Sequence, residues 1–341
     1  MTSEPVPVPG PSEPGSSTEG RARRRFPMWL AIVAATVSGA LLAVQSRING
    51  ELGRQLNDGY TAAAISFGSG LAILLIVLCF WKPGRVGLGR VARALRPNER
   101  GERELKPWML LGGLAGAFFV ASQGLTAAVL GVALFTVAIV AGQTISGIVL
   151  DRVGLAPGGH RPLTADRLIG SLLALAAVVW AVSAQLGGDV PFWMLIMPLI
   201  AGALAAWQQA VNGQVRAVAA SAQSATLINF IVGSAALIAI ALVRNAVVGW
   251  PAEFPTEPWL YIGGAIGCLL IAVQTVLVKV TGVLLLGLAT VSGQLVAALL
   301  LDLAVPGQAV AFSTIGGTLV ALIAVVVASG WLNSWRRAKA A

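Results

Sequence analysis

Two pairs of amide side chains occur at a spacing that puts each pair on one face of a helix. Gln45 and Asn49 are four residues apart, and so are Gln208 and Asn212. Residues four apart are neighbours on a helix surface. Two adjacent amides offer two carbonyl acceptors and four N–H donors, which suits a neutral or zwitterionic solute better than a bare ion. The alternative is that these amides hold helices together, which stabilises membrane helices by roughly 0.6–2 kcal/mol.

Three further amides lie inside apolar segments and are candidates for solute contact. Gln143 and Gln294 each follow a glycine that lets a neighbouring helix approach closely, so close helix packing is the alternative interpretation. Asn229 occupies the position that Ser66 has in the first half, so only the second half carries an amide there.

Two carboxylates, Asp151 and Asp302, end apolar segments and are candidates for proton coupling. The alternative is that they are turn residues at the membrane interface, with Arg152 neutralising Asp151. No Walker or Rossmann glycine pattern occurs. The single histidine and the two cysteines lie apart in the sequence. We therefore expect no enzymatic activity, no cofactor and no metal site.

The segments that carry these residues form an internal sequence repeat. The stretch 38–50 returns as 201–213 without a gap, at an offset of 163 residues that also pairs Phe67 with Phe230. Further along, the offset is 151 residues and pairs Gly142 with Gly293 and Asp151 with Asp302. The offset falls because the first half has a longer basic loop. A duplication of this kind is typical of secondary transporters.

Composition places these repeats in a membrane. Hydrophobic residues make up 57% of the chain, charged residues 11%, and the mean hydropathy is +0.82. Backbone polar groups in lipid must be satisfied within the segment, which predicts an all-α integral membrane protein. Ten apolar segments are each near the roughly 20 residues that span hydrocarbon: 28–47, 60–81, 107–126, 128–150, 166–186, 192–211, 223–244, 258–279, 282–303 and 312–332.

Five segments per copy is an odd number, so the two five-helix repeats are expected to cross the membrane in opposite directions. With alternating sides, 20 of the 23 Lys and Arg fall on the side of both termini, which predicts cytoplasmic termini. The expected organisation is a disordered tail (1–26), a first repeat (27–188), a second repeat (189–333) and a basic tail (334–341). If the first helix is straight, Gln45 lies roughly 26 Å along its axis from Met28. This places Gln45 and Asn49 toward the outer face of the membrane, and Gln208 and Asn212 toward the inner face.

The basic loop at 85–106 is expected to form a short solvated helix on the cytoplasmic side. Contact with anionic lipid is the alternative, which we disfavour because Glu99, Glu102 and Glu104 dilute the positive charge of the loop.

Two copies of Gln-x-x-x-Asn-Gly, each followed by a Phe-x-x-Gly segment, together with the Gly-Gln and terminal Asp residues, resemble the YdcZ-like branch of the drug/metabolite transporter (DMT) superfamily. The resemblance covers about 28–332. It implies two inverted five-helix repeats and a carrier in the bacterial inner membrane. Relatives in the small multidrug resistance family have a glutamate in the first helix, near the place of Gln45, which argues against export of cationic drugs.

The functional expectation is therefore a DMT-type secondary exporter of a small neutral, zwitterionic or weakly amphipathic metabolite. The alternative is a membrane subunit or lipid-handling scaffold that transports nothing. The expected partners are a small-molecule solute and the lipid bilayer, without nucleic acid. The sequence leaves the oligomeric state open, with a homodimer among the alternatives.

Overall fold

The structure is a computed structural model that describes residues 27–182, 192–303 and 312–329. The predicted tails, 1–26 and 334–341, lie outside this part. So do the side chains of some residues inside helices, including that of Asp302. The described helices are α1 (Met28–Leu56), α2 (Gly59–Phe80), α3 (Lys82–Ala94), α4 (Gly112–Val153), α5 (Ala165–Val182), α6 (Phe192–Ala219), α7 (Ala222–Val248), α8 (Gly263–Leu303) and α9 (Phe312–Ala328), with 3-10 turns η1 (Pro107–Leu111) and η3 (Pro258–Tyr261) before α4 and α8.

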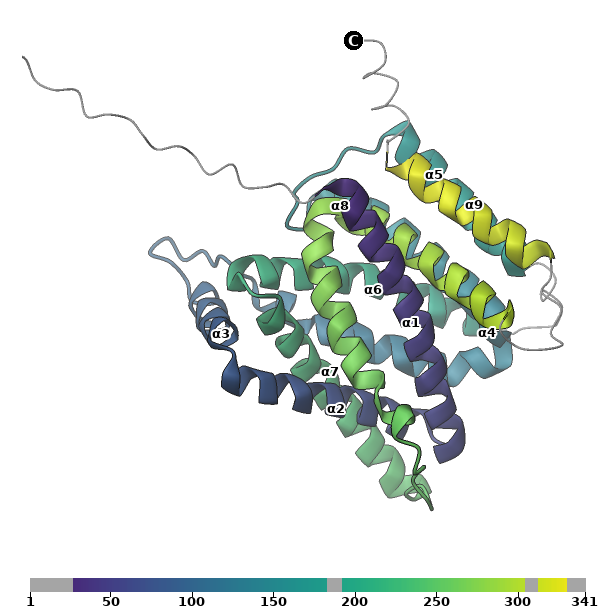
Figure 1. Ribbon diagram of the computed structural model, residues 1–341. Coiled ribbons are helices and arrows are strands. Elements are labelled where there is room, and N and C mark those ends of the chain that lie inside the picture. The colour runs from purple at the N-terminus through teal and green to yellow at the C-terminus, as the bar shows by residue number, and fades with distance from the viewer. Residues whose placement is uncertain (1–26, 183–191, 304–311, 330–341) are drawn as a thin grey trace, which may run out of the picture.

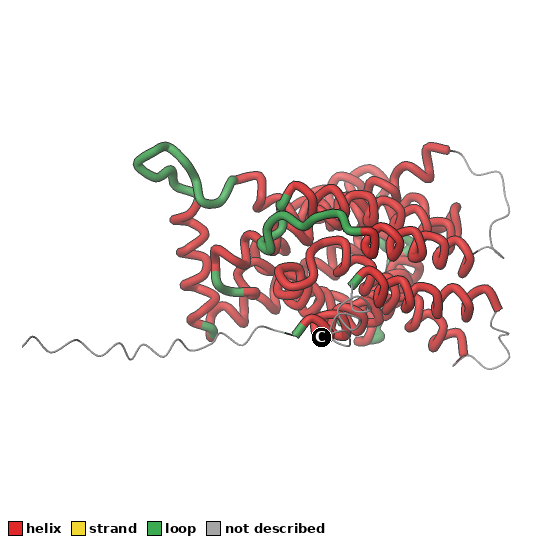
Figure 2. The backbone as a smooth tube through the Cα atoms, turned by 90° about the horizontal axis from the view of Figure 1, so that it is seen from above, coloured by secondary structure: helices red, strands yellow, loops and turns green. Residues whose placement is uncertain are grey.

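All regular structure in the described ranges is helical, which confirms the expected class (Figure 2). Four stretches are long and apolar enough to cross a membrane: Met28–Leu56, Gly59–Phe80, Ala222–Val248 and Pro258–Ala297. Pro107–Ser122 and Ile315–Ala328 are shorter apolar helices. A multi-pass helical membrane protein follows from these lengths and compositions.

Helix α8 contains a sharp break at Gly282, where φ is 78° and ψ is 175° (Figure 1). Only glycine adopts such a φ without steric cost. The chain turns back there, and residues 281–293 after the turn are all buried. The second part of α8 therefore lies at the centre of the bundle.

Helix α4 must also double back, because its contacts with α6 exclude a straight helix. A Cβ on Gly116 would lie 3.1 Å from Gln208 Nε2, and one on Gly142 would lie 1.9 Å from the Leu199 carbonyl oxygen. Residues 199 and 208 are about 14 Å apart along α6, whereas 116 and 142 would be about 39 Å apart along a straight helix. The sequence predicts two successive segments here, 107–126 and 128–150.

The closest helix contacts join one repeat to the other. A Cβ on Gly39 of α1 would lie 1.8 Å from the Thr290 carbonyl oxygen of α8, and a Cβ on Gly202 of α6 would lie 2.0 Å from the Ile139 carbonyl oxygen of α4. These two contacts are equivalent under the offsets of 163 and 151 residues. Small residues permit this approach of two backbones, and membrane helices gain packing from it.

The remaining helices also pack across the two repeats. Helix α2 packs against α7, and α5 packs against α9 at one edge of the bundle (Figure 1). Asp58 caps α2 by accepting from the Tyr60 N–H, and Ser221, at the equivalent position, caps α7 by accepting from the Ser224 N–H. The residues just before these caps, Asn57 and Ala220, both have a left-handed φ of 50°.

Helix α1 extends well past the predicted end of the first segment at residue 47. Leu52 and Leu56 are buried and pack with Leu260, so the apolar face continues to Leu56. Glu51 pairs with Arg54 on the exposed face of this extension. Gln45 is therefore eleven residues from the end of the helix, closer to its middle than the sequence-based boundary placed it.

Candidate functional site

The amides of the second repeat form a hydrogen-bonded cluster, here called the second-repeat cluster (Gln208, Asn212 and Asn229). Helix α6 supplies Gln208 and Asn212, and α7 supplies Asn229. Gln208 Nε2 and Asn212 Nδ2 donate to Asn229 Oδ1 at 3.0 and 2.9 Å. Asn229 is fully buried, and its Nδ2 has no partner.

The amides of the first repeat, Gln45 and Asn49, form the first-repeat pair and are bonded differently. Gln45 Nε2 donates to the Gly263 carbonyl oxygen at 2.8 Å. Asn49 Oδ1 is buried and accepts no hydrogen bond. A Cβ on Gly263 would lie 2.1 Å from Asn49 Oδ1 and 3.1 Å from Ser66 Oγ, so Asn49 and Ser66 meet at this glycine.

The difference between the two sites traces to one position. Asn229 reaches both amides of α6, whereas Ser66, at the equivalent place on α2, has a shorter side chain without a second polar atom. Asn49 Nδ2 therefore lacks the acceptor that Asn229 Oδ1 offers to Asn212 Nδ2, and Asn49 Oδ1 is separately without a donor among the described residues. An unpaired buried carbonyl oxygen costs about 1–3 kcal/mol, so Asn49 carries a hydrogen-bonding capacity that folding leaves unused.

Each amide pair lies against a glycine of the opposite repeat. A Cβ on Gly112 would lie 2.6 Å from Asn212 Oδ1, and a Cβ on Gly267 would lie 2.7 Å from Gln45 Nε2. Gly112 belongs to the first repeat and Gly267 to the second. The two amide pairs thus lie at the boundary between the repeats, where relative motion of the two halves would change their surroundings.

An aromatic pair lies between the two amide sites. The Phe67 and Phe230 rings are 5.1 Å apart, centroid to centroid, and tilted by 33°. Gly116 lies beside Gln208 and Phe67, and Gly267 lies beside Gln45 and Phe230. The rings therefore separate the first-repeat pair from the second-repeat cluster. The sequence matched these two residues across the repeat but gave no sign that they meet.

Gln143 and Gln294 lie farther along the same helix contacts. Gly142 packs against Leu199 and Ala203 of α6, one and a half turns from Gln208, and Gly293 packs in the equivalent way against α1. The close approach predicted at these glycines is confirmed. Gln143 is buried against Gly287, and Gln294 is half-buried. Within the described ranges, neither glutamine bonds to the other amides.

Asp151 stabilises the break in α8. Its Oδ1 accepts from the Val283 N–H at 2.8 Å, and its Oδ2 accepts from the Leu284 N–H at 3.3 Å. Arg167 of α5 forms an ion pair with Asp151, which is 1% exposed. The neighbour that the sequence suggested, Arg152, is exposed and does not make this pair. Side chains that meet in space from different helices gave no signal in the sequence.

Arg161 satisfies the other side of the same break. Its Nη2 donates to the carbonyl oxygens of Lys279 and Val280 at 3.0 and 2.7 Å. A broken helix leaves carbonyl groups unpaired before the break and N–H groups unpaired after it. Arg161 and Asp151 supply the two missing kinds of partner. The side chain of Asp302, the repeat-mate of Asp151, lies outside the described residues.

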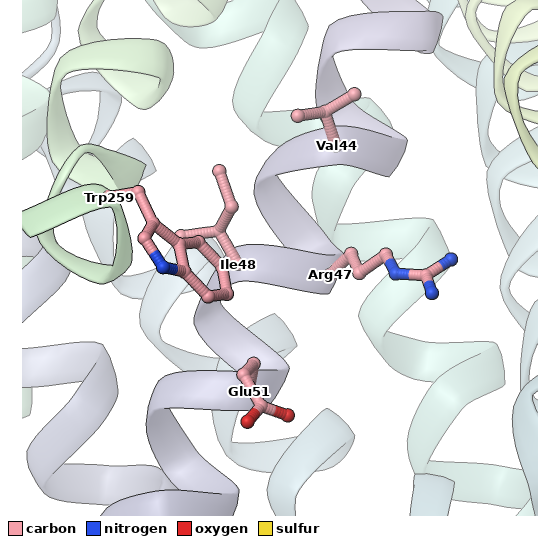
Figure 3. Close-up of a pocket in the computed structure, with 5 residues that line it drawn as sticks. All are labelled: Val44, Arg47, Ile48, Glu51 and Trp259. Atoms are coloured by element: carbon pink, nitrogen blue, oxygen red, sulfur yellow. The ribbon is translucent and has the colours of Figure 1, made fainter. Parts of the chain in front are cut away.

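A hollow of about 340 Å³ lies outside the amide sites. It is lined by Val44, Arg47, Ile48, Glu51 and Trp259, and in Figure 3 the Trp259 ring lies beside Ile48. Val44, Arg47 and Trp259 are exposed, so this hollow opens to the surroundings of the bundle. Among the described residues, no three His, Cys, Asp or Glu side chains gather as metal ligands would.

The duplicated sequence matches one protein family twice. The sequence model of the family described as "Putative inner membrane exporter, YdcZ" matches residues 30–180 and again residues 193–338. The chain belongs to the YdcZ family. The resemblance seen in the sequence is confirmed, and with it the assignment to DMT-type membrane transport proteins of the inner membrane.

This chain also resembles solved structures at the level of fold. One crystal structure of a protein superposes with a TM-score of 0.53 at 21% sequence identity, covering 89% of this chain and 96% of the other. At this identity the likeness shows the fold alone. No curated protein matches this chain.

Proposed function

We propose that this YdcZ-family protein is a secondary exporter of a small neutral, zwitterionic or weakly amphipathic metabolite. In this proposal ten helices form two inverted five-helix repeats with both termini in the cytoplasm, and the repeats rock against each other around the amide sites. The family match, the two sequence offsets and the equivalent glycine contacts support this arrangement.

The observation that carries the proposal is the unpaired carbonyl oxygen of Asn49. It is buried at the boundary between the repeats, next to Gly263, and accepts no hydrogen bond from any described residue. A solute N–H or O–H group would satisfy it. The solute class follows from this chemistry: a molecule with hydrogen-bond donors and no requirement for an opposite charge, because no Asp or Glu of the described residues bonds to Gln45 or Asn49.

The two ends of the α2–α7 contact supply candidate gates. At one end, Arg244 Nη1 lies 2.7 Å from Asp58 Oδ2, and Asn245 donates to Thr61. At the other end, Ser224 donates to the Gly84 carbonyl oxygen at 2.9 Å. Alternating access would break these contacts one end at a time, so that the solute meets the two sides of the membrane in turn.

A ligand screen followed by one substitution tests the solute-binding role. Purified protein is screened against metabolites by thermal shift, since a ligand that binds the folded state raises its apparent stability. Ser66→Asn then places a second amide beside Asn49, and the Nδ2 group of that amide can donate to the unpaired Asn49 Oδ1. We expect this variant to fold and to lose the thermal shift and the flux in proteoliposomes. Asn49→Ala should lose both as well.

The matched control is Ser66→Ala, which removes the hydroxyl group without supplying an amide. Ligand binding should survive in this variant. If Ser66→Asn and Asn49→Ala both bind and transport the ligand as the wild type does, the first-repeat pair is structural and the site assignment is wrong.

The second candidate function, a scaffold without transport, is favoured by the second-repeat cluster, whose amides bond to one another. Disruption of that cluster separates the two functions. Asn212→Ala should abolish flux in an exporter while the protein still folds. In a scaffold it should lower the melting temperature, and no metabolite should shift the melting temperature of the wild type.

A further inference from the structure

Helix α3 carries positive charge without any acidic residue. Its thirteen residues, Lys82–Ala94, include Lys82, Arg85, Arg90 and Arg93 and no Asp or Glu. The glutamates that dilute the charge of the basic loop all follow in the connection to α4, after the helix has ended. The charge of the helix is therefore concentrated, in contrast to the average over residues 85–106.

Two of the basic side chains of α3, Lys82 and Arg93, lie on the face opposite the packed one. Gly84, Gly87, Val91 and Ala94 form a buried stripe along α3. Val91 and Ala94 pack with Val215 and Ala219 at the end of α6 and with Ala225 of α7. Successive residues on a helix are 100° apart, so Lys82 and Arg93 point away from this stripe, and both are exposed.

The contacts of α3 place it beside the ends of three other helices. It begins two residues after α2 ends at Phe80. Arg90 donates to the carbonyl oxygen of Ala219, the last residue of α6, at 3.3 Å, and Ser224 in the first turn of α7 donates to Gly84. The ends of α2, α6 and α7 thus lie beside α3, which lies across them at the edge of the bundle (Figure 1).

Exposed aromatic residues lie at the junction of α2 and α3. Phe80 and Trp81, between α2 and α3, are 85% and 55% exposed. Tryptophan is enriched where the hydrocarbon meets the headgroups. A helix at this depth, with one face docked on the protein and the other basic, faces the phosphate layer of the membrane.

We propose that the basic face of α3 binds the headgroup of an anionic phospholipid. Lys82 and Arg93 supply charge on the exposed face, and Gly89 between them has open space above its backbone for a phosphate. Arg85 is anchored at the end of α2, where its guanidinium donates to the carbonyl oxygens of Leu78 and Cys79. Its remaining N–H groups are available to the same phosphate, because a guanidinium has five donors.

Lipid-dependent thermal stability of the full-length protein tests this proposal. Protein in nanodiscs of phosphatidylglycerol should melt about 2–4 °C above protein in nanodiscs of phosphatidylcholine. Lys82→Gln with Arg93→Gln should remove at least half of this difference. The packing of α3 should persist, because within the described part of the chain these side chains make no bond outside α3. Raising the salt concentration should reduce the difference in the wild type.

The matched control removes the same charge from the loop after the helix. Arg100→Gln with Arg103→Gln, at exposed positions beside the glutamates, should keep the full lipid difference. Equal losses in the two double variants would mean that only net charge matters and would overturn the proposal. It would also be overturned if the wild type shows no lipid difference, or if inorganic phosphate stabilises the protein in phosphatidylcholine as much as phosphatidylglycerol does. Should the double variant not fold, Arg93→Gln alone is compared with Arg100→Gln.

Discussion

Asp151 accepts a 2.8 Å hydrogen bond from the backbone N–H of Val283, the first residue after the break in α8. These two residues are 132 positions apart in the chain, one in each repeat. A single carboxylate therefore links the end of α4 to the buried second part of α8.

Asp151→Asn should destabilise the protein. The substitution leaves Arg167 without its buried partner, and breaking a buried ion pair in this way costs about 3–5 kcal/mol. We expect a lower melting temperature and reduced yield of folded protein. Arg152→Gln, one residue away and exposed, is the control and should melt as the wild type does. Equal stability of Asp151→Asn and wild type would show that the carboxylate charge is not needed at the break.

Asp302→Asn tests proton coupling. The Asp151 carboxylate already forms an ion pair with Arg167 and accepts hydrogen bonds from two backbone N–H groups. Of the two aspartates that end apolar segments, Asp302 is therefore the one that we propose for coupling. If it carries the proton, the variant should lose the pH dependence of flux in proteoliposomes with an imposed pH gradient, while ligand binding persists. A pH dependence that survives the substitution would exclude Asp302 as the proton carrier.

Gly39→Ala should prevent the close approach of α1 and α8. The added Cβ would lie 1.8 Å from the Thr290 carbonyl oxygen, which is backbone and cannot move aside. We expect little folded protein after detergent extraction, as judged by size-exclusion chromatography. Gly50→Ala, on the same helix with open space around the glycine, should be neutral or slightly stabilising. Similar yields of the two variants would contradict the packing described.

The inverted arrangement predicts opposite sides for two loops. Reporter fusions after residue 155 and after residue 188 should place the first in the cytoplasm and the second outside, because one segment lies between them. If both fusions report the same side, five segments per repeat is the wrong count.

Patterns that repeat along the chain were predictable from sequence, and contacts between distant helices were not. The duplication marked Gly142 and Gly293 as close-packing positions, and their contacts agree. From sequence, Arg152 was the expected partner of Asp151 because it is the next residue. Adjacent residues on a helix point about 100° apart, however. Arg167 of the next helix makes the ion pair instead.

The amide sites show the same division. Spacing put Gln208 and Asn212 on one face of a helix, and the pairing of Asn229 with Ser66 showed that the repeats differ at one position. That Asn229 bonds both amides of α6, while Asn49 is left without a partner, depends on how α7 and α2 are placed against α6 and α1. Periodicity within a segment does not contain that information.

The contact between Gly39 and Thr290 has a consequence for biosynthesis. The ribosome makes α1 about 250 residues before the part of α8 that covers it, so the small-residue face of α1 must remain against lipid or another helix until the chain is almost complete. The equivalent face of α6 meets α4, which is already in the membrane when α6 emerges. Of these two matching interfaces, one can close while the second repeat is still being made, and the other only near the end of translation.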